Sequence, residues 1–164
     1  MTSIGGFEID PRLDLVLERT VEVRPALVWK AWTEPEHMKP WFCPRPWSLA
    51  ECEVDLRPGG KFLTVMRSPE GEDMPAEAGC YLEVVPERRL VWTAALGPGY
   101  RPIAGGDLPF TAAILLEPHG EGGTRYTAIA IHRDEAGAEQ HEAMGFHEGW
   151  GTALDQLVEY VRTW

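Results

Sequence analysis

The sequence predicts an α+β fold in which a curved, seven-stranded antiparallel sheet surrounds a long C-terminal helix, with two short helices after the first strand. Residues 24–47 contain four of the seven tryptophans between closely spaced prolines. Short alternating runs between Gly- and Pro-rich turns follow, and apolar residues recur at helical spacing after Asp134. At 164 residues the chain fits a single domain, residues 1–164, with residues 1–11 as an N-terminal extension.

The first strand is predicted at residues 13–23, where aliphatic and β-branched side chains alternate with polar ones. Pro25 favours the first turn of a helix, because its missing N–H needs no partner there, and Pro35 ends this helix near Thr33. A second short helix begins at Pro35 and cannot continue through Pro44. The segment therefore predicts two short helices and a rigid exit.

Six further strands are predicted at residues 48–56, 61–67, 78–85, 89–96, 110–117 and 124–132. The turns between them are rich in glycine and proline, and the longest, residues 97–107, is too short to link two domains. Phe62, Thr64 and Met66 share one face of their strand, which predicts that one face of the sheet is buried.

One long helix is predicted from Asp134 to the end of the chain. Its apolar stripe consists of Ala143, His147, Trp150, Leu154, Leu157, Val158 and Val161. Such a helix buries its stripe only against the apolar face of the sheet. Seven strands at about 4.8 Å spacing span roughly 29 Å, whereas a helix is about 10–12 Å wide. The sheet is therefore expected to curl around the helix and to leave an internal pocket between them.

The composition excludes several classes of partner. The formal net charge is -11, from 15 Lys and Arg against 26 Asp and Glu, so nucleic acid is not an expected partner. The sequence has neither an N-terminal signal peptide nor a run of about 18 apolar residues, which predicts a cytoplasmic protein without a membrane partner. Cys43, Cys52 and Cys80 are widely spaced and odd in number, which indicates free thiols.

Four strings identify a resemblance to a known family. They are Val-Trp-Lys-Ala-Trp-Thr at residues 28–33, Asp-Leu-Arg-Pro-Gly-Gly-Lys-Phe at 55–62, Gly-Cys-Tyr-Leu-Glu-Val-Val-Pro at 79–86 and Gly-Phe-His-Glu-Gly-Trp at 145–150. With them the chain resembles the SRPBCC (START-like) superfamily, and within it the activator of heat-shock-protein-90 ATPase homologue family. The resemblance implies the helix-grip fold and a ligand cavity between the sheet and the terminal helix, lined by apolar and aromatic residues. It does not imply one substrate.

We predict that a small, largely apolar ligand binds in this cavity, without a cofactor. Aromatic and thioether side chains make an adaptable apolar surface. The candidate ligand-binding residues are Trp41, Phe42, Trp47, Phe62, Met66, Tyr81, Trp92, Phe110, His132, Met144 and His147. Trp29, Trp32 and Trp150 are expected to pack in the core instead.

An alternative function is an enzyme that uses the same cavity for general acid–base chemistry, such as cyclisation, dehydration or hydrolysis. His132 ends the last strand and His147 lies on the helix stripe, so the two imidazoles are expected to approach each other at the pocket mouth and are the candidates for catalysis. No metal site is predicted, because His141-Glu142 and His147-Glu148 lack the His-Glu-x-x-His spacing of a zinc-protease helix.

A second alternative is a chaperone cofactor or protein-interaction module. It would use exposed aromatic residues between Trp41 and Trp47. A homodimer is one form that such an interaction would take.

Overall fold

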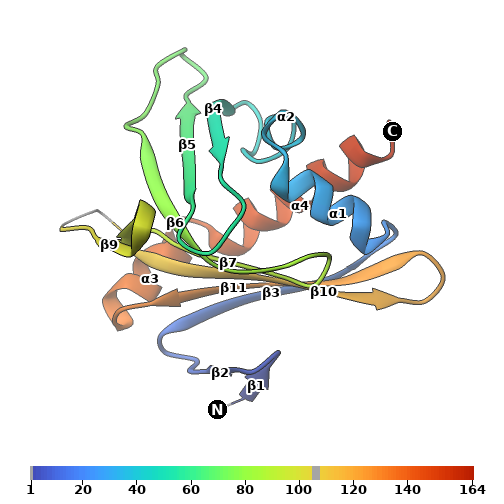
Figure 1. The fold of residues 1–164 in the computed structure, drawn as a ribbon, viewed down its shortest axis with the longest axis horizontal. Coiled ribbons are helices and arrows are strands. Elements are labelled where there is room, and N and C mark those ends of the chain that lie inside the picture. Colours follow the sequence, from blue (N-terminus) through green and yellow to red (C-terminus); the bar gives the residue numbers. More distant parts are fainter. Residues whose placement is uncertain (1, 105–107) are drawn as a thin grey trace.

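The computed structural model describes residues 2–104 and 108–164 and confirms the predicted architecture. Its central sheet is antiparallel, with the strand order β3-β11-β10-β7-β6-β5-β4, and curls around the C-terminal helix (Figure 1). The strands are β3 (Asp14–Val21), β4 (Ser48–Val54), β5 (Lys61–Arg67), β6 (Glu77–Val85), β7 (Arg89–Thr93), β10 (Phe110–His119) and β11 (Gly123–His132). The first and last strands of the predicted order therefore pair with each other, and β3 and β4 form the two edges.

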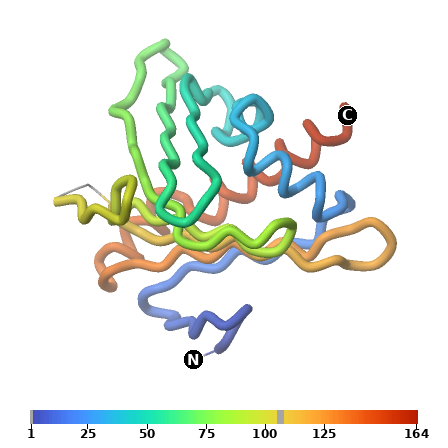
Figure 2. The backbone as a smooth tube through the Cα atoms, viewed as in Figure 1, coloured from blue at the N-terminus to red at the C-terminus, as the bar shows by residue number. Residues whose placement is uncertain are grey.

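Helices α1 (Pro25–Thr33) and α2 (Pro35–Met38) follow β3, as predicted, and lie on the concave side of the sheet (Figure 2). Pro25 and Pro35 each stand in the first turn of their helix. The indole Nε1 of Trp32 donates to the hydroxyl of Tyr126 on β11 at 3.1 Å. Helix α1 is thus fixed to the sheet by a buried hydrogen bond as well as by packing.

The predicted long C-terminal helix is present, but the expectation that it runs unbroken from Asp134 is wrong, because two helices occupy that segment. They are α3 (Glu135–Ala143) and α4 (Phe146–Val161). Gly145 separates them with a φ of 90°, a left-handed conformation that glycine adopts without strain. Asp134 caps α3 by accepting from the N–H of Gly137 at 2.8 Å. As a result α3 packs on the ends of β3 and β11, while α4 crosses the concave face.

The N-terminal extension forms a hairpin that was not predicted, made of β1 (Thr2–Ile4) and β2 (Phe7–Ile9). It covers the convex face of the sheet. Between the hairpin and the convex face lies a hydrophobic cluster separate from the concave core. Its buried members are Ile9, Val91, Ala113, Leu115 and Ile129. Arg89 ties the hairpin to the sheet, since its guanidinium donates to the carbonyl of Gly5 and lies over the ring of Phe7 at 5.1 Å.

A second small hairpin replaces the end of the strand predicted at residues 89–96, which stops at Thr93. β8 (Leu96–Gly97) and β9 (Arg101–Pro102) pair around the 3₁₀ turn η1 (Pro98–Tyr100). The amide of Gly99 donates to the carbonyl of Gly59 at 2.8 Å, which holds this hairpin against the turn before β5. Residues 105–107 of the predicted turn lie outside the described residues.

All three cysteines are free, as predicted. Burial raises the pKa of Cys43 and of Cys52 to about 11, so both side chains are thiols at neutral pH. In the part of the chain that the structure describes, every helix is too short or too polar to cross a bilayer. The cytoplasmic location remains a prediction.

Candidate functional site

Most aromatic side chains predicted to line the cavity meet on the concave side of the sheet, but they pack against one another. These residues are Trp41, Phe42, Phe62, Tyr81 and Trp92; together with Trp32, which was predicted to pack in the core, they are here called the aromatic core. Phe62 stacks on Tyr81 with ring centroids 5.2 Å apart, and Trp92 meets Phe62 edge-on at 5.3 Å. Trp41 meets Trp32 edge-on at 4.9 Å. These contacts are those of packed aromatic pairs, which prefer centroid distances of about 4.5–7 Å.

The hydroxyl of Tyr81 is the buried side-chain polar atom without a hydrogen-bond partner among the described residues. Burial, with a smaller effect from the nearby Cys52, raises the pKa of Tyr81 well above its usual value, so the phenol stays neutral. Two indoles of the aromatic core are bonded: Trp41 Nε1 donates to the carbonyl of Ala31 at 3.2 Å, and Trp32 Nε1 donates to the hydroxyl of Tyr126. The aromatic core is therefore a packing unit that contains one uncompensated hydroxyl.

A polar side chain of α4 holds the proline-rich exit from α2. Gln156 is buried, and its Nε2 donates to the carbonyls of Trp41 at 2.9 Å and Cys43 at 2.8 Å. Its Oε1 accepts from the amide of Arg45 at 3.0 Å. One side chain thus satisfies three backbone groups of a segment that has no regular structure of its own.

The imidazoles of His132 and His141 form a buried pair at the end of β11. His132 Nε2 lies 2.9 Å from His141 Nδ1, and His132 Nδ1 lies 2.7 Å from the carbonyl oxygen of Leu13. Because a carbonyl only accepts, Nδ1 of His132 carries a proton. With both rings neutral, Nδ1 of His141 therefore donates to Nε2 of His132, and Nε2 of His141 is left as an acceptor.

Aromatic rings pack around the histidine pair and leave His132 and His141 only 5% and 7% exposed. Ring centroids of Phe110 and Phe146 lie 4.8 and 5.1 Å from that of His141, and Trp150 lies at 6.2 Å. Burial, and then the neighbouring His132, lowers the pKa of His141 to about 4. His141 is consequently neutral at physiological pH.

The predicted approach of His132 to His147 is wrong. His147 is exposed, and its Nε2 donates to the carbonyl of Val16 at 3.2 Å on β3. The break at Gly145 explains the difference, because it turns α3 so that His141, not His147, meets the end of β11. His141 could not be predicted as the partner of His132, because an unbroken helix would have directed its side chain elsewhere.

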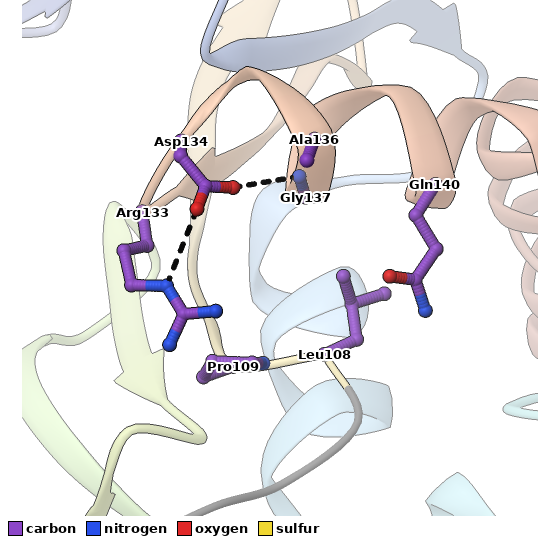
Figure 3. Close-up of a pocket in the computed structure, with 7 residues that line it drawn as sticks. All are labelled: Leu108, Pro109, Arg133, Asp134, Ala136, Gly137 and Gln140. Atoms are coloured by element: carbon purple, nitrogen blue, oxygen red, sulfur yellow. Dashed lines mark hydrogen bonds and ion pairs between the residues drawn. The ribbon is translucent and has the colours of Figure 1, made fainter.

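Two cavities lie beside the histidine pair, where β10 begins and β11 ends. The larger, about 360 Å³, is here called the strand-end groove and is lined by Ala95, Ile103, Pro109, Phe110, Thr111, Ile131, His132 and Arg133. The smaller, about 100 Å³, is lined by Leu108, Pro109, Arg133, Asp134, Ala136, Gly137 and Gln140 (Figure 3). Pro109 and Arg133 belong to both, so the two cavities adjoin.

The structure places two of the predicted ligand-binding residues, Phe110 and His132, on the strand-end groove. Trp47, Met66 and Met144 are exposed by 39%, 37% and 67% and line neither of the two cavities. Met144 stands in the break between α3 and α4. Sequence reasoning missed Ile103 and Arg133, because a loop aliphatic and a residue just after a strand carry no periodic signal.

Three side chains at α2 have potential metal-ligating atoms close together. The atoms of Glu34, Glu36 and His37 lie within 4.8 Å of one another. However, Nδ1 of His37 is engaged with the hydroxyl of Tyr160 at 2.7 Å, and Glu36 is exposed. Acidic groups gather in this way on many protein surfaces, and the cluster is assigned no metal.

The comparison with protein families agrees with this geometry. Residues 22–162 match the family described as Activator of Hsp90 ATPase homolog 1-like protein. The chain belongs to this family. The predicted resemblance is confirmed, and membership supports a ligand-binding helix-grip domain in general.

Solved structures show how far the similarity extends. A protein from Nitrosomonas europaea, known from its crystal structure, is 51% identical, and the match covers 94% of this chain and 97% of that one with a TM-score of 0.89. A protein from Arthrobacter aurescens is 21% identical over 95% and 90% of the two chains, with a TM-score of 0.79. An AHSA1-like protein from Aeromonas hydrophila is 20% identical over 92% and 93%, with a TM-score of 0.68. The last two share the fold alone. A comparison with curated proteins finds no match.

Proposed function

We propose that this protein binds a small, largely apolar molecule in the strand-end groove. The main support is the volume of the groove together with its mostly apolar lining. The groove measures about 360 Å³, and ligand pockets commonly measure about 300–1,000 Å³. Five of its lining residues are apolar, namely Ala95, Ile103, Pro109, Phe110 and Ile131.

Ile103 gives the groove an apolar mouth. It lies just after β9 and is 43% exposed, and its amide donates to the carbonyl of Ala95 at 3.1 Å, which fixes the loop that carries it. A ligand in the groove would cover this side chain and so remove apolar surface from water. Phe110 and His132, with near-parallel rings 6.1 Å apart, add aromatic surface.

The aromatic core is a less suitable site than the groove. Trp41, Tyr81 and Phe62 are at most 5% exposed, and their rings already contact neighbouring rings at packing distance. A ligand there would have to separate these pairs, each of which contributes about 0.5–1.5 kcal/mol beyond its buried area. The groove needs no such repacking.

Binding can be tested with 2-naphthamide, a neutral aromatic probe, by NMR of isoleucine methyl groups. We expect saturable shifts at Ile103 and Ile131 and none at Ile114, which lies inside the concave core. Ile103→Ser should weaken binding about tenfold, since an aliphatic side chain contributes about 1.5 kcal/mol when it is covered. Leu56→Ser is the matched control, because Leu56 is similarly exposed at 37% and lines neither cavity.

Two results would count against the proposal. One is the absence of any methyl shift at probe concentrations up to its solubility limit. The other is a shift at Ile114 without shifts at Ile103 and Ile131, which would place the probe between the sheet and α4 instead.

We also propose proton transfer as a second candidate function, because the His132–His141 contact favours it. A proton-transferring imidazole is commonly oriented by a further group, as the Leu13 carbonyl orients His132. Among the described residues, Nε2 of His141 has no hydrogen-bond partner. Hydrolysis of 4-nitrophenyl acetate tests this candidate: His141→Asn should lower the rate and His119→Asn, at an exposed position, should not. Equal rates in both variants would remove it.

A further inference from the structure

We infer that Arg133 makes the strand-end groove selective for apolar molecules that carry a carboxylate. This inference rests on the proposed function and adds the chemical class of the ligand. Arg133 follows β11 directly and lines both the groove and the smaller cavity beside it. Its side chain is 76% exposed, so a bound molecule can reach it without displacing the core.

The other polar side chains of the groove have already used their donors. His132 is engaged at both ring nitrogens, by the Leu13 carbonyl and by His141. The hydroxyl of Thr111 donates to Thr93 Oγ1 at 2.9 Å. Among the described side chains that line the groove, the guanidinium of Arg133 is therefore the one with donors to spare.

Asp134 contacts only one of the three guanidinium nitrogens of Arg133. A single contact joins them, from Nε to Oδ2 at 3.5 Å. The other carboxylate oxygen of Asp134 caps α3 through the amide of Gly137. The two terminal nitrogens of Arg133 point away from Asp134 (Figure 3). No described residue pairs with them, so they can bind a carboxylate in the two-pronged geometry that suits arginine.

The neighbouring charged residues do not cancel the attraction of Arg133 for a carboxylate ligand. Glu135, the next carboxylate along the chain, faces Arg12 at 3.7 Å. The net charge of -11 acts against anions at long range, but salt screens such effects beyond about 8–10 Å. A carboxylate that contacts Arg133 directly is therefore governed mainly by that contact. Its apolar body would cover Ile103 and Phe110.

A comparison of 2-naphthoate with 2-naphthamide tests the inference, because the two probes share their ring system and differ in charge. In the unaltered protein we expect naphthoate to bind about tenfold more tightly, as hydrogen bonds to charged groups contribute roughly that factor. Arg133→Gln should reduce the ratio to about one. Arg133→Lys should give an intermediate ratio, because lysine keeps the charge and loses the planar fork.

Arg125→Gln is the matched control, since Arg125 is also an exposed arginine of the β11 region but lies near the opposite end of the strand. It should keep the full preference for naphthoate. An unchanged ratio in Arg133→Gln, with both probes still shifting Ile103 and Ile131, would overturn the carboxylate selectivity and leave the proposed function standing. Failure of both probes to bind the unaltered protein would overturn the two together.

Discussion

Gln156 makes three hydrogen bonds that substitution by methionine would remove while nearly keeping the length of the side chain. Two of its partners, the carbonyls of Trp41 and Cys43, belong to buried residues, and a buried acceptor left unpaired costs about 1–3 kcal/mol. The third partner, the amide of Arg45, belongs to an exposed residue and can turn to water. We therefore expect Gln156→Met to lower the free energy of unfolding by about 3 kcal/mol.

Urea unfolding followed by circular dichroism measures this change. In a protein of this size about 3 kcal/mol corresponds to a loss of about 6–12 °C in Tm. Thr152→Ala provides the control, because Thr152 is exposed on the same helix and such changes stay within about 0.5 kcal/mol. If the two variants had the same midpoint and the same denaturant slope, the proline-rich exit would not depend on Gln156 and the reasoning would be refuted.

Two further predictions concern buried polar groups. Tyr81→Phe should raise the free energy of unfolding by about 1 kcal/mol, because it removes a hydroxyl without a partner in the described structure. Tyr126→Phe should lower the free energy of unfolding by about the same amount, because it removes the acceptor of Trp32. A loss of stability in Tyr81→Phe would contradict the first expectation. We expect the protein to become less stable as the pH falls from about 6.5 to about 4. In the folded protein the pKa of His141 is lowered to about 4, so the side chain stays neutral over most of this range. The unfolded chain binds a proton there, and protonation therefore favours unfolding. The effect is on the order of 3 kcal/mol, and unfolding curves across this pH range should be flatter for His141→Asn than for His119→Asn; identical curves would exclude His141 as the cause.

Part of the fold could be predicted because local sequence patterns determined it. The strand Lys61–Arg67 was predicted at its observed bounds, since alternation and flanking turns agree there. The break at Gly145 was not foreseen, because one glycine inside a helical pattern is often tolerated. The hairpin of β1 and β2 has strands of three residues, too short to display a period of two. Tertiary contacts, not local propensity, hold it on the sheet.

The candidate site could be predicted only in part, for a related reason. Phe110 begins β10 and His132 ends β11, and both strands alternate, so the direction of these side chains into the concave side followed from alternation. The partner of His132 depends on the φ of Gly145, which no side-chain pattern encodes. Ile103 and Arg133 reach the groove through a loop and a strand end, where the backbone path cannot be read from hydrophobic spacing.

The pairing of β3 with β11 has a consequence for how the chain folds as it is synthesised. Leu17 on β3 lies opposite Ala128 on β11, so β3 joins the sheet only when two segments that are far apart in the sequence meet. Closing so long a loop costs entropy before any contact rewards it. On the ribosome, β3 must therefore wait for nearly the whole chain. Until β11 emerges, its apolar side chains lack their native strand partner and are open to chaperones or to aggregation.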